Sequence, residues 1–217
     1  MMRNPLRCKP YANIFYIFVG VILTHGVIFF NKGIFWDGWV IYPNLIKNND
    51  WNVLWMIYYE SGRPSHFYVH LLSVFFADIL LGYRAVFIFA VFLIAYLTYR
   101  LCKLFRLPNN IAWLIAILST TFPSFLVGFE VILLPNIIDY SLFMCATWLF
   151  ISGTNNKQVT LLKGLRNIQF LLCLILYAIS FDTNSLLVYF YFFWALSFIP
   201  SIYNKNQNFL SKNTAIH

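Results

Sequence analysis

The chain has 217 residues and a net charge of +8, and 61% of its residues are hydrophobic whereas only 10% are charged. About a quarter of the residues of a soluble domain are charged, because they must cover its surface, so this composition excludes an ordinary soluble fold. The basic residues form no stripe or clustered patch, so no nucleic acid is expected as a partner. The sequence therefore predicts an all-α membrane protein surrounded by membrane lipids.

The first apolar run covers residues 11–30 and follows Arg3, Arg7 and Lys9. It is too long for a signal peptide and no small-x-small cleavage site follows it, so we expect a retained anchor helix. Five further runs can cross a bilayer when flanking Lys and Arg side chains reach back to its surface. They cover residues 85–99, 111–129, 131–151, 168–181 and 185–203.

Residues 65–82 are also apolar, which leaves a model with seven spans to consider. Basic residues decide between the models, because cytoplasmic loops of membrane proteins are enriched in Lys and Arg. If residues 65–82 do not cross, 11 of the 15 basic residues are cytoplasmic, namely Arg3, Arg7, Lys9, Arg100, Lys103, Arg106, Lys157, Lys163, Arg166, Lys205 and Lys212. We therefore predict about six transmembrane helices in a single polytopic domain, residues 1–217, with the N- and C-termini cytoplasmic.

Residues 31–83 form the outer loop of this topology, and their second half is predicted to be an interfacial helix on the outer side. At 100° per residue, His66, His70, Ser73 and Ala77 share one narrow stripe of that helix. Two imidazoles on one helical face are a pattern found in metal sites. A polar stripe on an interfacial helix accounts for both histidines as well, and no metal ligand is predicted.

The first outer loop begins Ile34-Phe35-Trp36-Asp37-Gly38-Trp39 and ends Gly62-Arg63-Pro64. An acidic residue among aromatic side chains just after the first span resembles the catalytic loop of GT-C-type polytopic membrane glycosyltransferases. The Gly-Arg-Pro run before a helix is similar to the bacterial members of that class that glucosylate O-antigen. Paired acids are common in that loop of the family, whereas Asp37 is followed by Gly38, and the chain resembles a short or truncated member.

The resemblance implies an enzyme that moves a sugar from a polyprenyl-phosphate donor to a hydroxyl of a glycan or lipid acceptor. The reaction would take place at the outer face of the bacterial cytoplasmic (inner) membrane. Asp37 would act as general base on the acceptor hydroxyl. The alternative interpretation is that Asp37 forms an Asx-turn beside Gly38. Arg63 and Arg84 would balance the charge of the leaving phosphate, and the alternative for Arg84 is a snorkelling anchor.

Other side chains at this predicted depth suit substrate binding. Trp36 and Trp39 flank Asp37 and can stack on a sugar ring, although an interfacial aromatic belt predicts them equally well. Glu130 and Asp182 suit a divalent cation, which is the one cofactor that the sequence leaves open. Asp139 lies inside the fourth span, where it should be paired, protonated or facing a wet cavity.

A second interpretation is a non-catalytic transporter or flippase subunit for a lipid-linked substrate. Transporters often contain internal repeats and helices broken by Gly or Pro, and the two halves of this sequence show no convincing repeat. The large first outer loop also favours the enzyme. Residues 181–185 separate two apolar runs and are predicted to form a hairpin turn.

Overall fold

The computed structural model describes residues 10–31, 33–34, 38–42, 46, 48–76, 78–121, 131, 133–156 and 168–183. The chain divides into two units, residues 1–183 and 184–217, and every described residue belongs to the first. The predicted last span, residues 185–203, lies outside the described residues. The single domain over residues 1–217 therefore stays a prediction.

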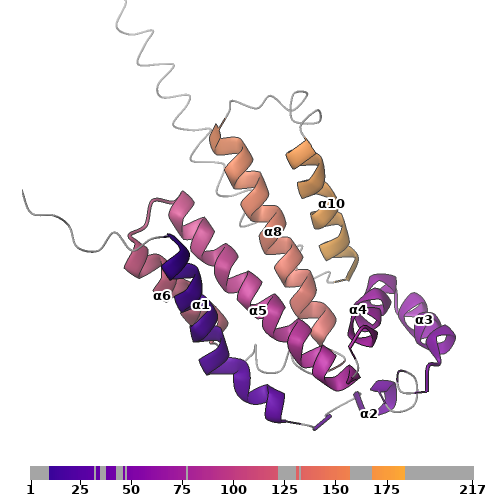
Figure 1. Cartoon of the computed structure of the whole chain (residues 1–217). Helices are drawn as coiled ribbons and strands as arrows, with labels where there is room; N and C mark the ends of the chain where they lie inside the picture. The colour runs from indigo at the N-terminus through magenta and orange to yellow at the C-terminus, as the bar shows by residue number, and fades with distance from the viewer. Residues whose placement is uncertain are drawn as a thin grey trace, which may run out of the picture. The chain divides into compact units, whose positions relative to one another are not determined.

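Within the described residues every regular element is a helix, which confirms the all-α class (Figure 1). The elements in chain order are α1 (Pro10–His25), the 3-10 helix η1 (Gly26–Phe30), α2 (Gly38–Ile41), α3 (Trp51–Glu60), α4 (Pro64–Val74), α5 (Ile79–Leu104), α6 (Asn109–Thr120), α8 (Leu134–Asn156) and α10 (Ile168–Thr183).

Among the described residues, three helical stretches are long and apolar enough to cross a membrane, namely Ala12–Phe30, Ile79–Leu104 and Leu134–Gly153. Two shorter apolar helices accompany them, α6 and the part of α10 up to Phe181. At 1.5 Å per residue α6 covers about 18 Å, which is less than the hydrocarbon core of roughly 30 Å. The six spans and the interfacial position of α4 therefore stay predictions.

The boundary between α4 and α5 differs from the single helix predicted over residues 65–82. Asp78 begins α5, because its Oδ1 accepts hydrogen bonds from the backbone N–H groups of Leu80 (2.9 Å) and Leu81 (3.1 Å). An N-terminal cap of this kind satisfies donors that have no partner within the helix. As a result α5 has 26 residues and extends beyond the predicted run of residues 85–99 at both ends.

Helix α5 packs against α1, α4, α6 and α8, and α8 also packs against α10 (Figure 1). The α1–α5 contact contains a buried polar pair, in which Asn13 Nδ2 donates to the Tyr99 hydroxyl at 2.9 Å. The apolar core around α5 includes Ile17, Val21, Phe87, Val91, Ala95, Ala112, Ala116 and Leu134. Large apolar side chains on α1 and α10 are exposed, as expected of helices that face lipid.

Candidate functional site

Seven residues were predicted from the sequence to form the site, and the structure describes the side chains of Arg63 and Arg84. Asp37, Trp36 and Glu130 lie outside the described residues, and so do the side chains of Trp39 and Asp182. The roles of these five stay predictions. The turn predicted at residues 181–185 was wrong at its start, because α10 continues as a helix to Thr183.

Arg84 lies in the second turn of α5 and is only 2% exposed. Its Nη2 donates a hydrogen bond to the carbonyl oxygen of Gly33 at 2.8 Å. A snorkelling side chain keeps its charge in water or among lipid headgroups, so that interpretation of Arg84 was wrong. Gly33 belongs to the segment that leads into the predicted catalytic loop. Arg84 therefore ties this segment to α5.

The same segment approaches the start of α8. A Cβ atom on Gly38, the buried first residue of α2, would lie 2.9 Å from Ile34 Cγ2 and 3.7 Å from Val131 Cβ. The missing side chain lets the backbone fold back on Ile34 and come close to Val131. Gly38 follows Asp37 in the sequence and Val131 follows Glu130. The segments that carry Asp37 and Glu130, two of the predicted site residues, therefore approach each other at Gly38 and Val131.

Arg63 lies at the junction of α3 and α4 and is exposed, unlike Arg84. Gly62 ends the α3 segment with φ +72°, a left-handed conformation that glycine adopts without strain. The Arg63 N–H donates to the Tyr58 carbonyl at 2.9 Å, and the His66 N–H donates to the Arg63 carbonyl at 3.1 Å. The backbone of Arg63 is thus fixed on both sides, while its guanidinium stays accessible to an anionic ligand.

Helix α4 places the two histidines of the predicted polar stripe on its inner face, while the side chains of Ser73 and Ala77 lie outside the described residues. His66 is 2% exposed and His70 is fully buried, whereas Phe75 just beyond the helix is 86% exposed. An outward apolar face is costly in water but not in lipid, because lipid tails are as apolar as leucine. His66 and His70 therefore contact other helices of the protein.

His70 links three helices through two short hydrogen bonds. Its Nε2 is hydrogen-bonded to the Tyr58 hydroxyl of α3 and its Nδ1 to the Tyr83 hydroxyl of α5, both at 2.6 Å. Burial, reinforced by the nearby His66, lowers the pKa of His70 to about 3, and burial raises the pKa of Tyr58. The ring is therefore neutral near pH 7, so that it donates to one tyrosine and accepts from the other. The histidine spacing in the sequence gives no indication of either tyrosine.

His66 joins α4 to α8 through Asp139. Its Nε2 lies 3.5 Å from Asp139 Oδ2, and both side chains are 3% exposed. Asp139 was predicted to be paired, protonated or facing a wet cavity, and the structure shows the pairing. The two histidines thus have different partners, and in the part of the chain that the structure describes no three His, Cys, Asp or Glu residues form a metal-binding group.

His25, the last residue of α1, is only 1% exposed. Its Nε2–H donates to the carbonyl oxygen of Thr120, the last residue of α6, at 2.8 Å. The imidazole also packs edge-on against Phe87 of α5, with ring centroids 5.8 Å apart. His25 therefore satisfies a helix-end carbonyl inside the bundle.

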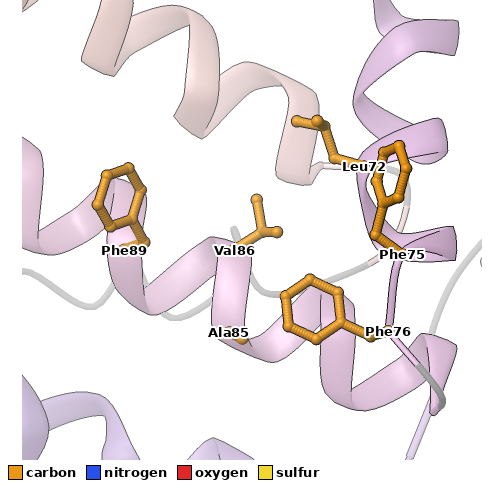
Figure 2. Close-up of a pocket in the computed structure, with 6 residues that line it drawn as sticks. All are labelled: Leu72, Phe75, Phe76, Ala85, Val86 and Phe89. Atoms are coloured by element: carbon orange, nitrogen blue, oxygen red, sulfur yellow. The ribbon is translucent and has the colours of Figure 1, made fainter.

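An open apolar groove of about 530 Å³ lies where the end of α4 meets the first turns of α5 (Figure 2). It is lined by Leu72, Phe75, Phe76, Ala85, Val86 and Phe89. Figure 2 shows two phenylalanine side chains from the α4 end and residues of α5 around the same space. A lining without polar atoms at the side-chain tips suits a hydrocarbon chain and offers no specific contact to a polar group.

Comparisons of the chain with protein-family models, curated proteins and solved structures gave no match. The glycosyltransferase resemblance therefore stays a prediction from short motifs. The described residues add three features that do not depend on it. These are the segment that Arg84 ties to α5, the buried histidine cluster of His66 and His70 on α4, and the apolar groove between the end of α4 and α5.

Proposed function

We propose that the chain is a membrane glycosyltransferase that moves a sugar from a polyprenyl-phosphate donor to an acceptor hydroxyl of a glycan or lipid. The observation that carries the proposal is the hydrogen bond from Arg84 to Gly33. It holds the segment before Asp37 against the first turns of α5, where the apolar groove also lies. A lipid-linked substrate needs an apolar groove and polar groups at one depth, because its tail lies in hydrocarbon and its phosphate at the bilayer surface.

In the proposed topology, six spans place both chain ends on the cytoplasmic side of a bacterial inner membrane. The isoprenoid chain of the donor lies along the groove, and Arg63 binds the donor phosphate. Arg84 has a structural role in this proposal. Its guanidinium is buried and bonded to the Gly33 carbonyl, so it holds the loop against α5. Trp36 and Trp39 stack on the sugar, and Glu130 and Asp182 contact the acceptor or a divalent cation.

The proposed reaction is a single displacement at the anomeric carbon. The Asp37 carboxylate takes the proton of the acceptor hydroxyl as its oxygen bonds to the anomeric carbon. The bond from that carbon to the phosphate oxygen breaks, and the phosphate leaves with the electron pair. Arg63 balances the charge that develops on the phosphate, and its planar fork of donors matches two phosphate oxygens.

Replacement of the proposed base tests the reaction. Asp37→Asn should lower sugar transfer by about 100-fold or more, because the amide keeps the shape of the carboxylate but takes up no proton. Asp50→Asn is a matched control, since Asp50 is an exposed acid before α3 whose side chain caps no backbone N–H. Transfer from polyprenyl-phosphate glucose is measured with purified protein in nanodiscs. Normal transfer by a correctly inserted Asp37→Asn variant would return Asp37 to the Asx-turn interpretation.

Arg63→Lys separates donor binding from a general surface effect. Lysine keeps the charge but loses the bidentate geometry, so the KM for the donor should rise while the KM for the acceptor stays constant. Arg106→Lys is the matched control, because Arg106 is also exposed but lies just beyond the far end of α5. An equal rise of both KM values would favour a structural role for Arg63.

The buried histidine cluster specifically favours the second function, a transporter or flippase subunit for a lipid-linked substrate. Ionisable residues among apolar helices mark proton relays in many transporters, and His66 and Asp139 form such a pair. Proteoliposomes loaded with a fluorescent polyprenyl-phosphate sugar distinguish the two functions. Sugar transfer supports the enzyme, whereas movement of the lipid between leaflets without transfer supports the transporter.

A further inference from the structure

The guanidinium of Arg100 is held between α5 and α8, which pack against each other (Figure 1). Its Cζ lies 5.0 Å from the centre of the Trp148 ring on α8 and 5.8 Å from the centre of the Tyr96 ring, one turn earlier on α5. Its Nη1 also donates a hydrogen bond to the Tyr96 hydroxyl at 2.8 Å. Contacts with two helices therefore fix the orientation of this partly buried side chain.

This arrangement leaves most of the hydrogen-bonding capacity of Arg100 unused. A guanidinium stacks on an aromatic ring through its face, whereas its N–H donors point along its plane. Among the described residues, the Tyr96 hydroxyl is the one acceptor that these donors meet. The planar fork that matches two oxygens of an anion therefore stays available.

Arg100 has no carboxylate partner in the part of the chain that the structure describes. The sequence contains no Asp or Glu between Asp78 and Glu130, and therefore none on α5 or α6. It contains none between Asp139 and Asp182 either, a stretch that includes the rest of α8. A partly buried cation without a counter-charge is costly, so an anion from outside the protein stabilises it.

The position of Arg100 along α5 indicates the source of that anion. Arg100 lies 21 residues after Ile79, the first residue of α5, which at 1.5 Å per residue is about 32 Å. This length matches the hydrocarbon core of about 30 Å. In a bilayer that α5 spans, Arg100 therefore lies at the headgroup layer opposite the candidate site. Lys103 lies on the same face three residues further on, and its ammonium donates to the Leu107 carbonyl at 2.9 Å.

We propose that Arg100 and Lys103 bind the phosphodiester of an anionic phospholipid in the leaflet at this end of α5. In the predicted topology this is the cytoplasmic leaflet. Arg100 offers its fork of donors to the phosphate oxygens, and Lys103 adds a second positive charge. The site does not rest on the proposed glycosyltransferase function, because it lies at the opposite end of α5 from the candidate site.

Lipid binding to the full chain, purified in detergent, tests the site. Native mass spectrometry gives the dissociation constants of the one-to-one complexes with dioleoyl phosphatidylglycerol, which is anionic, and dioleoyl phosphatidylcholine, which is zwitterionic. We expect the anionic lipid to bind at least about tenfold more tightly. Glycerophosphoglycerol, which is the same headgroup without acyl chains, serves as the free phosphodiester and should not displace the lipid at equal concentration.

Three variants separate a built site from general attraction between charges. Arg100→Lys keeps the charge but loses the fork, so the dissociation constant for the anionic lipid should rise by about tenfold while that for the zwitterionic lipid stays constant. Arg106→Gln is the matched control, because it removes a charge from the exposed turn just beyond α5, and should change either constant by less than about threefold. Tyr96→Phe removes only the hydroxyl that orients Arg100 and should weaken binding of the anionic lipid alone. If Arg100→Lys does not fold, Tyr96→Phe decides in its place.

Three results would overturn the proposal. Equal affinity of the unchanged chain for the two lipids would show that the phosphodiester charge is not recognised. Losses of anionic-lipid affinity that are equal in Arg100→Lys and Arg106→Gln would show general attraction between charges. Displacement of the lipid by glycerophosphoglycerol at equal concentration would identify a site for a free phosphodiester and not for a membrane lipid.

Discussion

Acidification should destabilise this protein through His70, by an amount that follows from its burial. Burial lowers the pKa of His70 in the folded protein to about 3, whereas a histidine in an unfolded chain has a pKa of about 6.5. Between these values the unfolded state binds a proton that the folded state does not, so stability is complete above about pH 6.5 and is lost as the pH falls. At about pH 5 this one group lowers the free energy of unfolding by about 2 kcal/mol.

The matched variant for this measurement is His70→Gln. Glutamine has a donor and an acceptor for the hydroxyls of Tyr58 and Tyr83 but no titration in this range. Unfolding by SDS in mixed micelles, followed by far-UV circular dichroism at about pH 7 and about pH 5, gives the loss for each protein. The original chain should lose about 2 kcal/mol more than His70→Gln. An equal loss in both proteins would refute the reasoning, because every other titrating group is common to them.

Three further changes test other parts of the structure. Gly38→Ala places a methyl group 2.9 Å from Ile34 Cγ2, an atom fixed close to the backbone, so we expect a loss of about 1–3 kcal/mol in the same unfolding assay. Asp78→Ala removes the cap of α5 and should cost about 1 kcal/mol, whereas Asp78→Asn keeps an acceptor and should cost less. Single cysteines introduced at Asn48 and at Asn109 should differ in how far an impermeant thiol reagent labels them in whole cells. We expect labelling of the cysteine at Asn48 alone. Labelling at Asn109 alone would contradict the predicted topology.

The long helices were predictable because their signals are local. Runs of apolar residues indicate α1, α5 and α8 without any knowledge of their neighbours. The start of α5 was also present in the sequence, since Asp78 directly precedes an apolar helical run, which is the usual place of an N-cap. The prediction over residues 65–82 failed because it followed the continuity of apolar residues and gave no weight to the capping side chain.

The candidate site was less predictable, because it depends on contacts between residues far apart in the chain. Arg63 and Arg84 were placed at the same depth by the sequence, yet one is exposed and the other buried. The difference comes from Gly33, which lies 51 positions before Arg84 in the chain. Its carbonyl oxygen accepts a hydrogen bond from the Arg84 guanidinium. Similarly, the spacing of His66 and His70 predicts a shared face but not the partners on other helices that bury it.

The pairing of His66 with Asp139 also constrains the order in which the helices pack during synthesis. During synthesis His66 leaves the ribosome well before Asp139, and at about 5–20 residues per second the interval is on the order of 4–15 seconds. During that time α4, α5 and α6 are completed, but the inner face of α4 has no α8 to contact. The contact of α4 with α8 therefore forms late, after insertion of a helix that comes far behind it. A ribosome stalled before residue 139 should leave α4 open to proteases that the finished protein resists.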